Sequence, residues 1–283
     1  MTALLALLSS AVWGGADFMG GTLSRRLPAF IVVGASQAIA LLVLVPVIFV
    51  LGATGDPTGY LPWGIAAGAL GMVSLVAFYQ ALAVGTMGVV APIAATGVVV
   101  PVAIGLGQGE RPATVQLLGI VAAVAGVVLA SGPEVSGAGA GTARGGSRAL
   151  VLALASASGF GLVLWLIAKG AHYSVAMTLL SQRCASVTVF VVIAVALRRT
   201  GGLQVGHLPQ LAVIGVGDAA ANGMYALATR SGLISLVAVL GSLYPVVTAL
   251  LARVVHGERL RPVQNIGVVA ALAGVVMIAA GGT

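Results

Sequence analysis

Apolar residues occur along this chain in stretches of about 20, each separated from the next by a short cluster of glycine, proline or charged residues. A helix rises 1.5 Å per residue, so about 20 apolar residues cross the hydrocarbon core of a bilayer. The pattern therefore predicts an all-α membrane protein with ten spanning helices and short connections. Their expected ranges are about 2–22, 29–51, 61–84, 87–107, 112–131, 149–169, 174–197, 208–229, 232–255 and 262–281.

Composition supports this interpretation. Of 283 residues, 60% are hydrophobic and 7% charged, and the mean hydropathy is +1.15, which leaves too few ionic groups to cover a soluble globule. The first stretch has neither a basic region before it nor a cleavage site after it, so we expect a retained helix. The single cysteine, Cys184, lies within the seventh stretch, where we expect a small packing residue.

The net charge of +7 does not indicate a nucleic-acid partner, because basic residues stand one or two at a time at segment ends. The loops after even-numbered segments hold three of them, Arg111, Lys169 and Arg230. The loops after odd-numbered segments hold nine, which are Arg25, Arg26, Arg144, Arg148, Arg198, Arg199, Arg253, Arg259 and Arg261. This bias favours odd loops in the cytoplasm and both termini outside. We expect a multi-pass protein of the cytoplasmic (plasma) membrane.

The chain contains an internal repeat. The stretch GERPATVQLLGIVAAVAGVVL from Gly109 aligns without a gap on GERLRPVQNIGVVAALAGVVM from Gly257. Two weaker matches pair QALAVGTMG from Gln80 with YALATRSG from Tyr225, and Ser36-Gln37 with Ser181-Gln182. We expect five segments in residues 1–131, a Gly/Ala/Ser linker over 132–147, and five segments in 148–283, forming one integrated membrane domain. An odd number of crossings per half predicts an inverted repeat.

The repeat carries motifs that resemble the EamA-like exporters of the drug/metabolite transporter superfamily. The matching residues are Pro101, Glu110, Gln116 and Gly119 in the first half, and Pro245, Glu258, Gln264 and Gly267 in the second. The resemblance implies ten helices around a central cavity that carries small metabolites or drugs, usually outward. One departure is that seven residues separate Pro101 from Gly109, against eleven between Pro245 and Gly257, so the fourth segment is expected to be shorter or bent.

Three charged residues fall inside predicted helices, namely Asp17, Arg183 and Asp218. A charge at mid-bilayer costs from about 3 to above 10 kcal/mol, so it normally faces a cavity or a partner. Trp13 shares a helical face with Asp17, and Asn222 and Tyr225 follow Asp218 at helical spacing. In the first half, the positions that match Asp218, Asn222 and Tyr225 are Val73, Ala77 and Gln80. The polar stripe is therefore expected in one half only.

We expect a mid-membrane cavity between the two halves. Its predicted substrate-binding lining is Trp13, Asp17, Gln80, Gln182, Arg183, Asp218, Asn222, Tyr225 and Tyr244. Arg183 is expected either to pair with one of the two aspartates, to hold the helices together, or to reach towards an interface.

Two roles remain open for the candidate proton-coupling residues Asp17 and Asp218. A desolvated carboxyl group exchanges protons near neutral pH, whereas one paired with arginine stays ionised. The acids therefore either couple transport to protons or complement a charged or zwitterionic substrate. The expected function is secondary active transport by alternating access, with a small-molecule substrate and the bilayer as partners, as a monomer or a homodimer.

Rival functions are an intramembrane aspartyl protease, a lipid-linked sugar flippase and a noncatalytic sensor. The protease rests on GVGD at 215–218 with Asp17 as the second acid, but glycine makes up 41 of 283 residues, so such a match arises easily by chance. No phosphate loop, zinc signature or dinucleotide fingerprint is present. The histidines, His172, His207 and His256, stand alone at segment ends. We therefore expect no enzyme, cofactor or metal.

Overall fold

The computed structural model describes residues 1–85, 87–130, 146–197, 202–256 and 262–280, and the regular elements among them are all helices. The α-helices of the first half are α1 (Thr2–Leu23), α2 (Ala29–Leu51), α3 (Leu61–Val84), α4 (Met87–Ala95), α5 (Val99–Gly107) and α6 (Thr114–Ala130). Those of the second half are α7 (Gly146–Ala171), α8 (Val175–Leu197), α9 (Leu208–Ser231), α10 (Ile234–Gly241), α11 (Tyr244–His256) and α12 (Pro262–Ala280). Short 3₁₀ turns occur at η1 (Ala53–Gly55), η2 (Thr58–Tyr60), η3 (Thr96–Val98) and η4 (Val205–His207).

The fourth and ninth predicted segments are each divided into two helices. The first breaks at η3, between α4 and α5, and the second at Ser242 and Leu243, between α10 and α11. Pro101 and Pro245 each lie in the first turn of the following helix, where the missing N–H of proline has no intrahelical partner to lose. The fourth segment was expected to be shorter or bent, and the structure shows that the ninth segment breaks as well.

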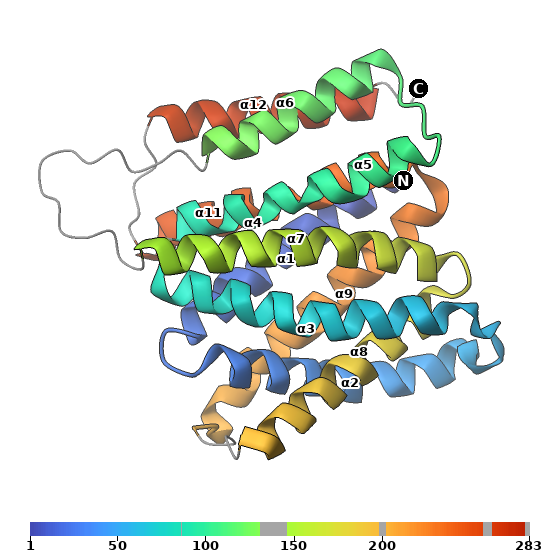
Figure 1. Ribbon diagram of the computed structural model, residues 1–283, viewed down its shortest axis with the longest axis vertical. Helices are drawn as coiled ribbons and strands as arrows, with labels where there is room; N and C mark the ends of the chain where they lie inside the picture. The colour runs from blue at the N-terminus through green and yellow to red at the C-terminus, as the bar shows by residue number, and fades with distance from the viewer. Residues whose placement is uncertain (86, 131–145, 198–201, 257–261, 281–283) are drawn as a thin grey trace, which may run out of the picture.

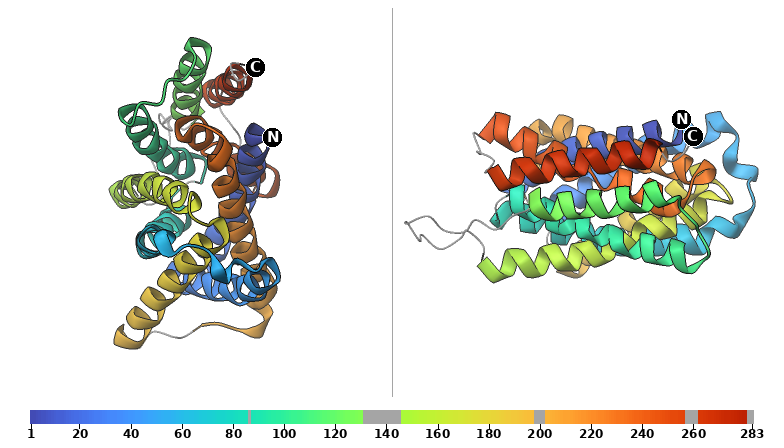
Figure 2. Two further views of the ribbon diagram at one scale, coloured as in Figure 1. Left: turned by 90° about the vertical axis from the view of Figure 1, so that its right-hand side faces the viewer. Right: turned by 90° about the horizontal axis from the view of Figure 1, so that it is seen from above.

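Seven helical spans of the described residues are long and apolar enough to cross a membrane. Two shorter apolar helices, Ile93–Gly107 and Thr114–Gly126, accompany them. The helices run side by side, and α1 begins on the same side of the molecule where α12 ends (Figures 1 and 2). The protein is thus an all-α, multi-pass membrane protein. The number of crossings, ten, remains a prediction.

Helix packing repeats between the two halves. The helix α3 packs against α7 as α9 packs against α1, and α4 packs against α7 as α10 packs against α1. The last helices of the halves, α6 and α12, lie along one another (Figures 1 and 2). Exchanging each helix for its counterpart leaves this set of contacts unchanged. The two halves are therefore related by an approximate twofold axis.

The structure also fixes the register of the repeat. The helices α3 and α9 each have 24 residues, and both their starts and their ends lie 147 positions apart. The first residues of α4 and α10 are likewise 147 positions apart, whereas α2 and α8 begin and end 146 positions apart. This makes Phe78 the counterpart of Tyr225 and Gln37 the counterpart of Arg183. The register predicted from the sequence paired Gln80 with Tyr225 and Gln37 with Gln182, and was wrong by two positions and one position respectively.

Close backbone contact supports this register. A Cβ at Gly68 would collide with the carbonyl group of Gln182, and a Cβ at Gly215, which is 147 positions later, would collide with the carbonyl group of Ser36. Small residues that allow such close approach are the usual basis of helix packing in lipid, where apolar burial gives little driving force.

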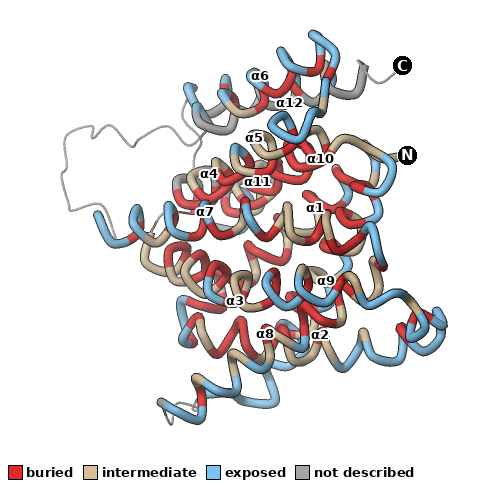
Figure 3. The backbone as a smooth tube through the Cα atoms, turned by 45° about the vertical axis from the view of Figure 1, so that its right-hand side comes forward, coloured by how far each residue is buried: buried red, intermediate tan, exposed pale blue. Residues whose placement is uncertain are grey.

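Large apolar side chains cover the perimeter. Phe49 in α2 and Val195 in α8 are each 70% exposed, and exposed residues mark the outer faces of these helices in Figure 3. Contiguous exposed apolar surface of this kind is unfavourable in water and matches the hydrocarbon core of a bilayer.

Candidate functional site

A cavity of about 80 Å³ lies between the two halves, near the middle of α8 and α9. Water molecules fit in it, because one water needs about 10–15 Å³. Seven of the nine residues predicted from the sequence line it, namely Trp13, Asp17, Gln182, Arg183, Asp218, Asn222 and Tyr244.

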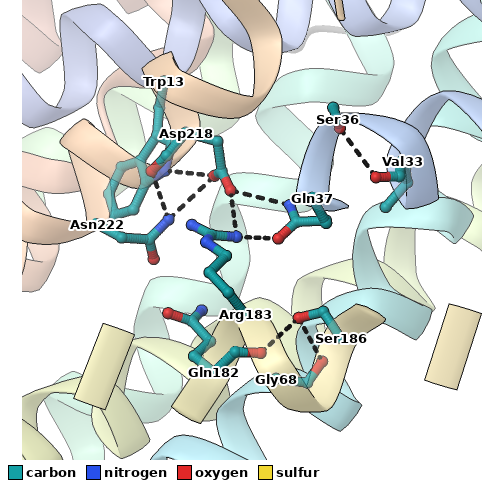
Figure 4. Close-up of polar contacts among 10 residues, drawn as sticks. All are labelled: Trp13, Val33, Ser36, Gln37, Gly68, Gln182, Arg183, Ser186, Asp218 and Asn222. Carbon is teal, nitrogen blue, oxygen red and sulfur yellow. Dashed lines mark hydrogen bonds and ion pairs between the residues drawn. The ribbon is translucent and has the colours of Figure 1, made fainter. Parts of the chain in front are cut away.

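The most densely bonded group in the cavity is the carboxylate of Asp218 (Figure 4). Its Oδ2 lies 2.8 Å from Nη1 of Arg183 and accepts a hydrogen bond from Nε2 of Gln37 at 3.1 Å. Its Oδ1 accepts hydrogen bonds from Nε1 of Trp13 at 3.1 Å and Nδ2 of Asn222 at 3.0 Å. Helices α1, α2, α8 and α9 thus meet at one carboxylate, and its charge is fully compensated.

Gln37 completes this network as a bridge. Its amide nitrogen donates to Asp218, and its carbonyl oxygen accepts from Nη1 of Arg183. Gln37 was not among the lining residues predicted from the sequence, although Ser36-Gln37 matches Ser181-Gln182 in the repeat. The correct register would have revealed its position, because Gln37 is the counterpart of the intramembrane Arg183.

Arg183 is 2% exposed, so it neither lies in lipid nor reaches an interface. Among the open alternatives, the structure selects an ion pair with Asp218, which is the ion pair found among the described residues. The guanidinium group uses Nη1 for both partners, while Nη2 and Nε have no hydrogen-bond partner. Arg183 therefore lines the cavity with two buried guanidinium nitrogens whose N–H groups no protein acceptor satisfies.

Asp17 has a different environment. It is 8% exposed and lines the cavity, but no arginine, lysine or histidine of the described residues pairs with it. The hydroxyl of Tyr79 lies beside its carboxyl group without reaching hydrogen-bond geometry. The Tyr79 ring packs against Gly20, one turn further along α1, where a Cβ would collide with it. Sequence reasoning missed Tyr79 because the incorrect register drew attention to Gln80.

The cavity has a polar wall and an apolar wall. Trp13 and Asp17 of α1 line the polar side, and their counterparts in α7, 147 positions later, are Phe160 and Leu164. Asp218 and Asn222 of α9 have Gly71 and Leu75 of α3 as counterparts. Aromatic contacts follow the same register, with ring centroids 5.8 Å apart for Trp13 and Tyr225 and 5.4 Å apart for Phe160 and Phe78. The repeated scaffold therefore carries its polar groups on one side only.

Two predicted lining residues lie elsewhere. Tyr225 is fully buried behind Trp13 and supports that ring instead of facing the cavity. Gln80 is half-buried and outside the lining. It follows Tyr79 directly, and consecutive residues of a helix point about 100° apart, so it turns away from the face that bears Met72 and Tyr79.

Other residues that stood out in the sequence lie away from the cavity or outside the described part of the chain. Cys184 is exposed on the outer face of α8, so the expectation of a packed residue was wrong. His172 is exposed at the end of α7, and His207 is half-buried beside the start of α9. The motif residue Glu258 lies outside the described residues, as does the linker, and the side chains of Gln264 and His256 are likewise not described.

An aspartyl protease needs two carboxyl groups that share a proton and activate water. Asp218 instead forms a salt bridge with Arg183 and accepts three side-chain hydrogen bonds. The geometry around Asp17 and Asp218 thus does not favour this chemistry.

The model of the EamA-like transporter family matches residues 1–132 and 147–280, in two copies that together cover most of the chain. The chain belongs to this family. A solved structure described as "Crystal structure of protein" has the same fold, with a TM-score of 0.76 at 16% sequence identity over 98% of this chain and 95% of that chain. No curated protein matches the chain. EamA-like family membership indicates a membrane transporter of small substrates, and neither the protease nor the flippase is favoured.

Proposed function

We propose that this EamA-like protein is a secondary transporter that exports a small cationic or zwitterionic molecule by alternating access, and that Asp17 exchanges a proton for the cationic group of that molecule. The observation that carries the proposal is the buried carboxyl group of Asp17, which faces the cavity without a cation beside it.

Charge balance in the cavity supports this role. Asp218 and Arg183 neutralise each other across 2.8 Å, so an ionised Asp17 leaves one net negative charge at membrane depth. Such a charge costs from about 3 to above 10 kcal/mol when it has no counterion. Either a proton or a cationic substrate removes that cost. Since both act on the same carboxyl group, binding of one displaces the other, which is the requirement for antiport.

The two walls of the cavity favour an amphipathic substrate. We assign the cationic group to the part of the cavity lined by Asp17 and Gln182, whose side-chain Oε1 has no hydrogen-bond partner. We assign the anionic group of a zwitterion to Arg183, whose Nη2 and Nε have no hydrogen-bond partner in the protein. The apolar body packs against Phe160 and Leu75 on the opposite wall, where aromatic and aliphatic contacts exclude water.

The repeat supports alternating access. Two halves of five segments each, related by an approximate twofold axis, enter the membrane from opposite sides, so a rocking motion exposes a shared site to each side in turn. The arginine bias favours an exterior location for the side where α1 begins. Export is the direction that the family resemblance favours.

The test uses purified protein in liposomes with an imposed pH gradient and a trapped pH-sensitive dye. Added substrates are radiolabelled amino acids with apolar side chains and an aromatic organic cation. We expect Asp17→Asn to lose gradient-driven flux by at least about tenfold, or 1.4 kcal/mol. Asp56→Asn, a change of the same type in the loop after α2, is the matched control. Equal proton-coupled flux in the two variants would exclude Asp17 as the coupling residue.

A further inference from the structure

The Gly-Glu-Arg motif of the first half takes no part in the central cavity. Its acid, Glu110, lies in the loop between α5 and α6, where its carboxylate reaches across to the second half. Oε1 accepts a hydrogen bond from the backbone N–H of Ile234 at 2.7 Å, and Oε2 accepts one from the backbone N–H of Ser235 at 3.0 Å. These two residues begin α10.

This contact has the geometry of a helix cap supplied by another part of the chain. The first N–H groups of a helix have no intrahelical partner, and the helix dipole favours an anion beside them. Gly105 leaves room for the carboxylate, because a Cβ there would lie 2.6 Å from Oε2 of Glu110. The backbone N–H of Glu110 also donates to the carbonyl oxygen of Gly105 at 3.1 Å. The contact therefore joins α5 of one half to α10 of the other.

The helix α10 separates two hollows. On one side is a vestibule of about 760 Å³, which Glu110 lines together with Arg230, Leu233 and Leu240. The central cavity begins one residue further along, at Gly241 and Ser242. The helix has eight residues, with non-helical backbone before it at Gly232 and Leu233 and after it at Ser242 and Leu243. The breaks at both ends are hinge positions about which α10 can tilt relative to α1 and α5, the helices it packs against.

We infer that Glu110 is a latch that holds α10 closed between the vestibule and the central cavity. While both hydrogen bonds are made, α10 blocks passage. When they break, its first turn moves away from the α5–α6 loop and opens a path to Ser242. The motif thus gates access from the side where α1 begins. This inference rests on the alternating access proposed above, but its test requires no substrate.

The test measures how readily a thiol at the cavity wall reacts with a charged maleimide. In a Cys184→Ser background, Ser242→Cys supplies the thiol, and the purified protein is labelled in detergent. We expect Glu110→Gln to raise the labelling rate by about tenfold, which corresponds to about 1.4 kcal/mol in the gating equilibrium. Gly105→Ala should have a similar effect, because the added methyl group displaces the carboxylate without changing the charge. Asp56→Asn removes an acid from the same side of the protein and should leave labelling unchanged.

A purely structural cap gives a different pattern. In that case Glu110→Gln and Gly105→Ala lower the thermal unfolding midpoint while the labelling rate stays at the level of Asp56→Asn, and the latch is refuted. Faster labelling at a temperature well below unfolding supports the latch. Faster labelling in a protein that moves no tested substrate would leave the latch standing and count against the proposed transport function alone.

Discussion

Removing the positive charge from the Arg183–Asp218 pair is the perturbation whose effect the structure defines most sharply. In Arg183→Met, an unbranched apolar side chain of similar length replaces the guanidinium group. Asp218 then keeps its hydrogen bonds from Trp13, Gln37 and Asn222 but loses its counterion. An ionised carboxylate remains buried beside a second one, Asp17, so the variant pays an electrostatic cost that the wild-type protein avoids.

The magnitude follows from burial. Arg183 is 2% exposed and the side chain of Asp218 is 14% exposed, so solvent screens the pair poorly. Breaking a buried pair by removing one partner costs about 3–5 kcal/mol, whereas replacing both partners is often nearly neutral. At about 2–4 °C per kcal/mol, Arg183→Met should lower the unfolding midpoint by roughly 6–20 °C. The double variant Arg183→Met/Asp218→Asn should recover more than half of that loss.

The assay is thermal unfolding of the purified variants in one detergent, arranged as a double-mutant cycle. Asp17→Asn is the comparison, because Asp17 has no ion pair to lose and its replacement should shift the midpoint by less than about 2 °C. Two results would contradict the view that Asp218 is held in a structural ion pair while Asp17 is not. One is an equal loss of the unfolding midpoint in Arg183→Met and Asp17→Asn. The other is a double variant whose midpoint is no higher than that of Arg183→Met.

Two further variants test the packing and the apolar wall. Gly215→Ala should cost about 1–3 kcal/mol because its Cβ would meet the backbone of Ser36, whereas Gly217→Ala on the same helix meets nothing closer than 3.6 Å and should be neutral in the same unfolding assay. Leu164→Ala should raise the KM of substrates with an apolar body by roughly tenfold, since about 1.5 kcal/mol or more of apolar contact is lost. A small hydrophilic cation should show no such change in liposome uptake, and an equal rise for both substrates would contradict an apolar subsite.

The helices could be predicted from the sequence because lipid imposes a simple requirement on them. Each crossing needs about 20 apolar residues, and that period is visible without any knowledge of packing. The breaks at Thr96–Val98 and at Ser242 and Leu243 were less visible. A proline in the first turn of a helix marks them, but the same proline is compatible with a continuous, kinked helix.

The site was predicted in outline because intramembrane charge is rare and costly, which singled out Asp17, Arg183 and Asp218. The choice of partner for Arg183 depends on the rotation of α8 relative to α9, which no local pattern encodes. Gln37 was missed for a related reason. An uncharged amide at a helix–helix contact is common, and its role appears only when the register of the repeat is known.

The contact of Glu110 with α10 could not be predicted from the sequence. It joins residues more than 120 positions apart through backbone N–H groups, which every residue but proline possesses. The sequence showed that the motif is repeated, but a repeated motif has the same appearance whether it packs helices or gates a passage.

The asymmetry of the cavity explains how a duplicated scaffold can carry a single exchangeable charge. If both halves had kept the polar set, the positions of Leu164 and Gly71 would hold two more aspartates, while the position of Gln37 would hold one more arginine. Four acids and two arginines would leave two net negative charges at membrane depth, twice the uncompensated charge of the present arrangement. Apolar residues and glycine in one wall, with an amide at Gln37, reduce the excess to the one carboxyl group that a proton or a monovalent cation can neutralise. The same substitutions create the apolar surface against which the body of a substrate packs. The loss of symmetry at these three positions thus sets the charge stoichiometry and the amphipathic shape of the site together, while the helix register that places them remains symmetric.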